Sequence, residues 1–335
     1  MLSSLKNKAP NYQHKISNEL NFYKDCHEVH ALPDIFHYWS NKYLLPKQQP
    51  HGFNSPDDFF VKKTLEQINQ ADLNQCFNIL SVGCGNGESE IQLAQQITSQ
   101  GHSNFKIICL DINPSMLERC NQAAKKMKLE NHIVTLCADF NLWTTDLSFD
   151  VIIANQCLHH VLALEHLFDT IHQALTENGV FLVSDMIGRN GHMRWPEALD
   201  LLNDVWQQLP DRIKHNRLLN RFEKNYINHD CSTSGFEGIR AQDVLPLLVE
   251  RFHFNLFIPF ANIIMVLIDR PFGHNFDINK PQDLARIDET HLLDEQAILD
   301  GLIKPTQMIA VLSKGSGMSV LTHEKLTPEF CIRPY

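Results

Sequence analysis

The chain has 335 residues, 43% of them hydrophobic and 20% charged, and its formal net charge is −10. This length allows one large domain with additions, or two domains, and the apolar content is sufficient for a full core. The negative charge disfavours a nucleic-acid partner, because binding to phosphates depends on lysine and arginine.

Residues 1–75 are polar and aromatic, and their pattern predicts helices that are interrupted at prolines. This first segment is predicted to be an N-terminal helical cap. Within it, residues 34–40 concentrate several large rings. One interpretation is that Phe36 and Trp39, three residues apart, form a helix face that packs on the core.

A ligand-binding core is predicted for residues 76–189. It begins with an apolar strand, residues 79–82, that leads into Gly83, Gly85 and Gly87. Glycines in such a turn permit positive φ angles and leave room for a ligand to contact the backbone, and the following helix directs free N–H groups at the turn. The Gly-x-Gly-x-Gly spacing differs from that of dinucleotide folds and therefore disfavours an oxidoreductase.

Further apolar runs in this core predict strands that end at polar residues. The second run ends at Asp111, whose carboxylate can accept both ribose hydroxyls of a nucleoside. The third run continues to Asp139 and Phe140, and the fourth leads into Asn155 and Gln156. A fifth strand is predicted over residues 180–184.

Residues 190–240 are predicted to form a helical insertion for substrate recognition. Residues 196–209 have helical spacing and end at Pro210, and residues 226–240 are rich in hydrogen-bonding side chains beside glycines. Such a composition is typical of a loop that closes on a polar ligand. Glu237 and Arg240 are candidates for this site, or for an ion pair with each other at a helix start.

The remaining residues, 241–335, are predicted to complete the core sheet with a helical elaboration. A helix over 241–251 precedes a strand over 253–260, and another helix and a seventh strand follow. The longest apolar stretch, residues 254–268, contains Pro259 and Asn262 and is shorter than a membrane span. We therefore expect no membrane-spanning segment.

Cysteine and histidine usage gives two further expectations. The nine cysteines include no Cys-x-x-Cys pair, and no basic segment followed by an apolar run opens the chain. These features predict reduced thiols in a cytoplasmic protein. The 18 histidines are scattered, and the adjacent His159 and His160 cannot both point the same way from regular structure, so no metal site is predicted.

The glycine turn and the polar strand ends resemble those of the class I S-adenosylmethionine-dependent methyltransferases, most closely from residue 77 to about residue 188. The resemblance implies a doubly wound, mostly parallel sheet of seven strands with a Rossmann-like fold, and methyl transfer from S-adenosylmethionine. In related enzymes, segments such as residues 34–40 often fold over the cofactor mouth. The cofactor-binding residues implied are Ser81, Gly83, Cys84, Gly85, Gly87, Asp111, Ile112, Asp139, Phe140, Asn155 and Gln156.

Ser81 is a departure from the family pattern. Many members carry an acid two residues before the first glycine, where it helps to hold the cofactor, whereas a serine hydroxyl brings no charge. The methionine ammonium is therefore expected to rely on backbone carbonyls near Gly83 and Asn155.

The acceptor of the methyl group is predicted to be a small molecule or a sugar-like group. Residues 226–240 resemble a segment of bacterial methyltransferases linked to glycan modification. A general base is needed only if the acceptor must lose a proton, and His159, His160 and His229 are the candidates for it. Glu237 and Arg240 are further candidates for the active site, without that role. Two alternatives remain: a protein or nucleic-acid acceptor, although no Asn-Pro-Pro-Tyr follows the fourth strand, and a protein that binds S-adenosylmethionine without turnover.

Overall fold

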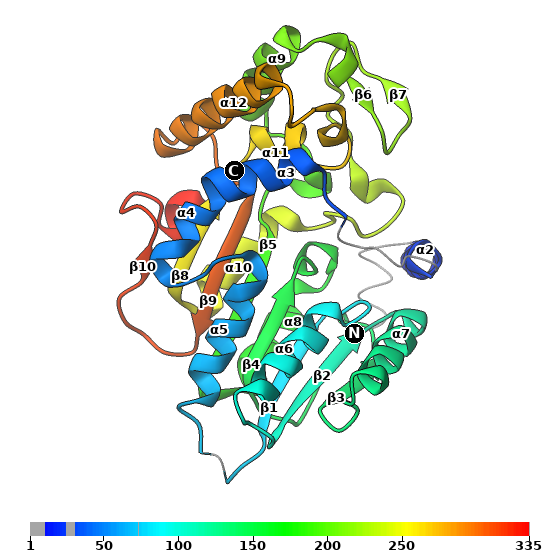
Figure 1. Cartoon of the computed structure of the whole chain (residues 1–335), viewed down its shortest axis with the longest axis vertical. Coiled ribbons are helices and arrows are strands. Elements are labelled where there is room, and N and C mark those ends of the chain that lie inside the picture. The colour runs from blue at the N-terminus through cyan, green and yellow to red at the C-terminus, as the bar shows by residue number, and fades with distance from the viewer. Residues whose placement is uncertain (1–10, 25–30, 73, 335) are drawn as a thin grey trace.

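The computed structural model describes residues 11–24, 31–72 and 74–334. Its centre is an eight-stranded sheet with the order β10-β8-β9-β5-β4-β1-β2-β3 (Figure 1). The strands are β1 (Phe77–Val82), β2 (Phe105–Asp111), β3 (Ile133–Cys137), β4 (Phe149–Asn155), β5 (Leu175–Met186), β8 (His253–Phe260), β9 (Gln307–Ser313) and β10 (Val320–Leu321).

The sheet is doubly wound, as the sequence predicts. Strands β1 to β5 are parallel, and the chain order reverses between β1 and β4, which are neighbours in the sheet. Strand β9 lies antiparallel to both β5 and β8. The expected number of seven strands is wrong by one, because the two-residue strand β10 pairs with β8 at the edge. A crevice for a ligand is expected where the order reverses, at the carboxyl ends of the strands.

Helices cover both faces of the sheet. Helices α5 (Pro56–Ile68), α6 (Glu88–Ser99) and α7 (Pro114–Lys126) pack side by side, and α8 (Leu164–Ala174), α10 (Ala241–Arg251) and α13 (Pro328–Cys331) form a second group. In α6, the side chains of Ile91, Ala94 and Ile97 recur at helical spacing and are buried. Burial of such a face is what fixes a helix on a sheet, at about 1.5–3 kcal/mol for each large apolar side chain.

The aromatic segment packs in the core, as the helix-face interpretation predicts. It forms α3 (Asp34–Trp39), followed by η1 (Ser40–Leu44), α4 (Leu45–Gln48) and η2 (Gln49–His51). The indole of Trp39 is 1% exposed, and its Nε1 donates to Nδ1 of His291 at 3.2 Å. None of residues 34–40 lines the cleft described below, so the alternative that this segment folds over the cofactor mouth is wrong. Helix α2 (Tyr12–Tyr23), earlier in the same predicted cap, lies elsewhere and contacts the site described below.

The insertion and the C-terminal helices gather at one end of the molecule (Figure 1). They comprise η4 (Asn190–His192), α9 (Pro196–Gln208), η5 (Asp211–Ile213), the hairpin β6 (His215–Asn216) and β7 (Arg221–Phe222), η6 (Cys231–Thr233), α11 (Ile263–Ile268), η7 (Gly273–Asn275) and α12 (Pro281–Leu299). The long apolar stretch forms β8 and α11. Among the described residues, no helix combines the length and the apolar character that crossing a bilayer requires.

Candidate active site

A cleft with about 920 Å³ of open space lies at the carboxyl ends of β1, β2 and β4. This is the position that the reversal of strand order predicts for a ligand. Residues from the glycine turn, from the ends of β2 and β4, and from α2 line it: Glu19, Tyr23, Ser81, Gly83, Cys84, Gly85, Asn86, Glu88, Ser89, Glu90, Asp111, Ile112, Asn113, Met116, Phe140, Asn155, Gln156, Cys157 and His160. Most of the cofactor-binding residues predicted from the sequence are among them.

The glycine turn needs glycine for two different reasons. Gly83 and Gly85 line the cleft with φ angles of 70° and 56°, and a Cβ on Gly83 would lie 2.5 Å from Cβ of Cys157. Gly87 is not among the residues that line the cleft. A Cβ there would lie 2.2 Å from Sγ of Cys120, so this glycine allows α6 to pack closely on α7.

Asp111 shapes the glycine turn from the end of β2. Its Oδ2 accepts from the Gly85 N–H at 2.9 Å, and its Oδ1 accepts from the Asn113 N–H at 2.8 Å. Burial raises the pKa of this carboxyl group, although these backbone donors oppose the shift. A carboxylate has about four lone-pair positions, so the two oxygens can still accept from ribose hydroxyls.

The third predicted strand ends earlier than expected, at Cys137, and Asp139 and Phe140 follow in a loop. Phe140 lines the cleft. Asp139 is absent from the lining residues, because its carboxylate is held by the protein. One oxygen accepts from the hydroxyl of Tyr12 in α2, and the other accepts from the N–H of Asn141 at 2.9 Å. Its role in cofactor binding stays a prediction.

The end of β4 turns sharply into the cleft. Gln156 has a φ angle of 52°, which is uncommon for a residue other than glycine, and its N–H donates to the Ser184 carbonyl at 2.8 Å. Such conformations often occur at binding sites. The turn brings Asn155, Gln156 and Cys157 to the cleft wall.

Glu90 is a site residue that the sequence analysis did not identify. Its side chain is 5% exposed, lines the cleft, and accepts a hydrogen bond from Oγ of Ser81 at 2.6 Å. The available signal was an acid on the inner face of an amphipathic helix, where a buried charge is unusual.

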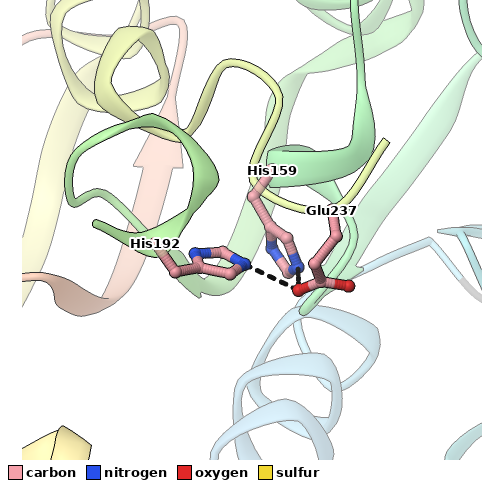
Figure 2. A group of neighbouring side chains, drawn as sticks. All are labelled: His159, His192 and Glu237. Carbon is pink, nitrogen blue, oxygen red and sulfur yellow. Dashed lines mark hydrogen bonds and ion pairs between the residues drawn. The ribbon is translucent and has the colours of Figure 1, made fainter. Parts of the chain in front are cut away.

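Beside the cleft, Glu237 joins three imidazoles from two separate segments. Figure 2 shows His159 and His192 directed at one oxygen of this carboxylate, with Nε2–Oε1 distances of 3.5 Å and 2.6 Å. Its second oxygen lies 3.3 Å from Nε2 of His160. We call these four residues the Glu237 cluster. The expectation that His159 and His160 cannot point the same way is wrong, because they lie in a 3₁₀ turn, η3 (Leu158–His160), and not in regular structure.

Charges within the Glu237 cluster are strongly coupled. Burial lowers the pKa of His159, but Asp185, whose Oδ1 lies 2.6 Å from Nδ1, and Glu237 outweigh burial and raise it to about 10. Burial alone would raise the pKa of Glu237, yet hydrogen bonds from His159 and His192 hold it well below its usual range. Burial lowers the pKa of His192. At neutral pH, His159 is therefore cationic, Glu237 anionic and His192 neutral.

Close backbone contacts bring the insertion loop to the cluster. The N–H of Gly191 donates to the Gly238 carbonyl at 2.8 Å, and both glycines have positive φ angles. A Cβ on Gly238 would lie 2.9 Å from Cε1 of His192 and 3.0 Å from the Gly191 nitrogen. The glycine beside Glu237 therefore permits the approach that joins Glu237 to His192. The sequence analysis missed His192 and Asp185, since no local pattern marks either one.

Two other predicted catalytic residues lie outside this cluster. One interpretation of the sequence was an ion pair between Arg240 and Glu237, and this interpretation is wrong. The guanidinium of Arg240 binds Glu165 at 2.7 and 2.8 Å and Asp243 at 2.7 Å, so it anchors the end of the loop. His229 is exposed, and its backbone N–H donates to the Ile227 carbonyl. A catalytic role for either residue stays a prediction.

Helix α2 covers the region between the cleft and the insertion loop. Glu19 lies 2.9 Å from Nδ1 of His160 and also lines the cleft. Nζ of Lys15 donates to the carbonyls of Ser232 and Gly235 at 2.6 and 2.7 Å, and Asn18 donates to that of Ser234 at 2.8 Å. The helix therefore ties the insertion loop to the core.

A family model described as a methyltransferase domain matches residues 73–250, which is more than half of the chain. The chain belongs to this methyltransferase family. Its cofactor is S-adenosylmethionine, as predicted from the sequence.

Among characterised relatives, this chain is 29% identical over 110 residues to 27-O-demethylrifamycin SV methyltransferase of Amycolatopsis mediterranei (strain S699), covering 32% of this chain and 38% of that protein. It is 27% identical over 164 residues to sterol 24-C-methyltransferase of Debaryomyces hansenii, covering 45% of this chain and 41% of that protein. The matches therefore span about two-fifths of the length of these relatives.

Among solved structures, one similar chain is the O-methyltransferase from a trans-AT polyketide synthase multienzyme of Brevibacillus brevis, in complex with S-adenosyl-L-homocysteine. The TM-score is 0.46 with 16% sequence identity, and the alignment covers 83% of this chain and 78% of that one.

The residues of the cleft fit S-adenosylmethionine. The turn formed by Gly83 and Gly85 lets a ligand contact the backbone, Asp111 offers acceptors for ribose hydroxyls, and Phe140 offers an apolar face. These groups belong to neighbouring strands, so an elongated nucleoside can contact all of them at once.

We expect Asp111→Ala to weaken the binding of S-adenosylmethionine by at least about tenfold, because two charge-assisted hydrogen bonds are lost and the Gly85 N–H loses its acceptor. Calorimetric titration of wild type and variant measures the effect, with NAD as the control ligand. Unchanged affinity in the variant would contradict the assigned role of Asp111, and a response to NAD would contradict the cofactor assignment.

Proposed function

We propose that this protein transfers the methyl group of S-adenosylmethionine to a hydroxyl group of a small-molecule or sugar-like acceptor. The observation that carries this proposal is the Glu237 cluster, which places an acid–imidazole network directly beside the cofactor cleft. His160 belongs to both, because it lines the cleft and faces Glu237 at 3.3 Å.

Coverage of the cluster favours a small acceptor over a protein or a nucleic acid. His159 is 3% exposed, and α2 bonds to the carbonyls of the insertion loop across the site. A side chain of a protein or a base of a nucleic acid would need a wider opening to reach the cluster. The net charge of −10 further disfavours a nucleic acid.

When bound, S-adenosylmethionine supplies a methyl group on a sulfonium, which is already a good leaving group. The work of the protein is therefore to bind and orient the acceptor, since proximity can supply much of the rate. The carboxylate of Glu237 can accept a hydrogen bond from an acceptor hydroxyl, because its pKa is held low and it remains anionic.

We assign the role of proton acceptor to His160. Its ring lies between two carboxylates, with Nδ1 2.9 Å from Glu19 and Nε2 3.3 Å from Glu237. An imidazole nitrogen that carries no proton can take one from the acceptor hydroxyl. His159 is already cationic and bound to Asp185, so its role is to hold Glu237 in place.

Methyl transfer from labelled S-adenosylmethionine to a panel of small hydroxylated acceptors, including sugars, tests the proposal. We expect turnover with at least one hydroxylated acceptor and a loss of activity in Asp111→Ala. Transfer only to protein or RNA fractions of a cell extract would overturn the proposed acceptor class. Binding of S-adenosylmethionine without transfer to any fraction would favour the non-enzymatic alternative.

Removal of metal ions is expected to leave this activity unchanged. Ligand atoms of His159, His192 and Glu237 lie within 4.8 Å of one another, a grouping that could hold a metal ion and that the scattered sequence positions do not predict. However, Nε2 of His192 lies 2.6 Å from the carboxylate, which is a hydrogen-bond distance. Assays after dialysis against EDTA, with and without added Mg²⁺ or Zn²⁺, check this expectation, and metal-dependent recovery would contradict it.

A further inference from the structure

The carboxylate of Glu90 lines the cofactor cleft and has no cationic partner in the part of the chain that the structure describes. Its side chain is 5% exposed, and it accepts a hydrogen bond from Ser81 at 2.6 Å. Among the described residues, no lysine, arginine or histidine forms an ion pair with it. A buried charge is costly unless it is paired, so this arrangement calls for a positive ligand group.

The groups that face Glu90 from neighbouring elements are acids or neutral polar groups. They include Ser81 of β1, Glu88 and its own N–H in α6, Cys84 of the glycine turn, Cys109 and Asp111 of β2, Cys120 of α7, and Cys157 after β4. Burial, with contributions from Asp111 and Glu88, raises the pKa of Glu90 to about 7. Among the described residues, no side chain therefore supplies a formal positive charge to this carboxylate, and only the Ser81 hydroxyl and the N–H groups of the first turn of α6 favour its charged form.

The sheet order shows which end of the cofactor meets Glu90. Asp111 and Phe140, the groups suited to the ribose and adenine, follow β2 and β3. Ser81 and Asn155 belong to β1 and β4, on the other side along the sheet. The cleft is lined by all of these residues, and Glu90 lies with Ser81. An elongated ligand with its nucleoside over β2 and β3 thus places its amino-acid end beside Glu90.

We propose that Glu90 binds the ammonium group of the methionine portion of S-adenosylmethionine, supplying from helix α6 the negative charge that Ser81 on strand β1 lacks. This inference rests on the proposed cofactor and revises the expectation that backbone carbonyls alone hold the ammonium. Ser81 is a positioning residue, because its hydroxyl fixes one carboxylate oxygen. Compared with the family pattern, the carboxylate is carried by the helix, at Glu90, and a hydroxyl takes its place on the strand, at Ser81.

Calorimetric titration of S-adenosylmethionine into Glu90→Gln tests the proposal. We expect affinity to fall about 10- to 100-fold, the range for losing one charge-assisted hydrogen bond. Glu118→Gln is the matched control, because Glu118 is exposed on α7 and bonds to Gln122, away from the cleft. It should bind as the wild type does. Wild-type affinity in Glu90→Gln would overturn the proposal, whereas a wild type that fails to bind would instead overturn the cofactor assignment.

A misfolded variant can be recognised from its stability without ligand. A raised carboxyl pKa means that the folded protein holds a proton that the unfolded chain has lost, so stability falls as pH rises from about 4.5 to about 7. Glu90→Gln removes the ionisable group and therefore this fall in stability. Its Tm should equal or exceed that of the wild type at pH 7.5 while its binding is weaker, and a lower Tm at that pH would contradict the account of an uncompensated carboxylate.

Two further measurements separate ammonium binding from a purely structural role. Titrations near pH 6.5 in buffers of different ionisation enthalpy should show proton release by the wild type and less release by Glu90→Gln. The exchanged variant Ser81→Asp/Glu90→Ser should recover part of the affinity that Glu90→Ser alone loses. Equal proton release, or no recovery although the double variant is folded, would count against the proposal.

Discussion

Replacing Glu237 with glutamine is expected to lower kcat by about 10²- to 10⁴-fold, the usual contribution of general acid–base catalysis. The amide keeps the size of the side chain but removes the negative charge that faces His159, His160 and His192. Because Glu237 does not line the cofactor cleft, the Kd for S-adenosylmethionine should change little. Steady-state kinetics with the best acceptor of the panel, together with calorimetry, measure both quantities.

A matched control for this variant lies in the same predicted insertion. Glu197 forms an ion pair with Arg333 at 2.7 Å and makes no contact with the Glu237 cluster. Glu197→Gln should therefore keep kcat, because it breaks one partly exposed ion pair of small energetic value. If Glu237→Gln retained wild-type kcat with the same acceptor, the cluster would be structural and its assigned role in proton transfer would be wrong.

Gly83→Ala should abolish measurable cofactor binding and destabilise the fold. Alanine at a φ angle of 70° costs about 1–2 kcal/mol through the left-handed conformation. In addition, the new Cβ would lie 2.5 Å from Cβ of Cys157. Relief of that overlap requires displacement of the turn or of the segment after β4, and both line the cleft. Overpacking of this kind typically adds about 1–3 kcal/mol.

Gly101→Ala separates backbone strain from the local overlap. Gly101 has a φ angle of 89°, and a Cβ there meets no atom within 4 Å. This variant should lose only the strain energy of about 1–2 kcal/mol and should bind S-adenosylmethionine normally. Thermal or chemical denaturation and calorimetry of both variants make the comparison. Equal binding by Gly83→Ala and Gly101→Ala would show that the turn does not contact the cofactor.

The cofactor site was largely predictable because its residues occupy positions that local sequence defines. Asp111 ends an apolar strand, and Gly83 and Gly85 lie where a strand turns into a helix. In a parallel sheet, the ends of neighbouring strands meet at one edge, so a linear series of strand ends becomes one cleft. The family resemblance covered the same positions.

The Glu237 cluster was only partly predictable. His159, His192 and Glu237 come from segments more than 30 residues apart, and a close approach between Gly191 and Gly238 joins them. The charge of each group also depends on burial and on its neighbours. Sequence suggested His159, His160 and Glu237 as separate candidates, but their contacts with one another, with Asp185 and with His192 arise only from loop packing.

By itself, the sequence determined the strands of the core and the glycine turn, because strand periodicity and turn chemistry are local properties. The doubly wound order of those strands and the cofactor followed from the family resemblance that these residues carry. Tertiary structure decided that Trp39 is buried in the core with Phe36 packed against that core, that Arg240 binds Glu165 and not Glu237, and that Glu90 meets Ser81. Each of these outcomes depends on which side chains become neighbours when helices and loops close on the sheet. A buried charge reveals its function only when the groups around it are known.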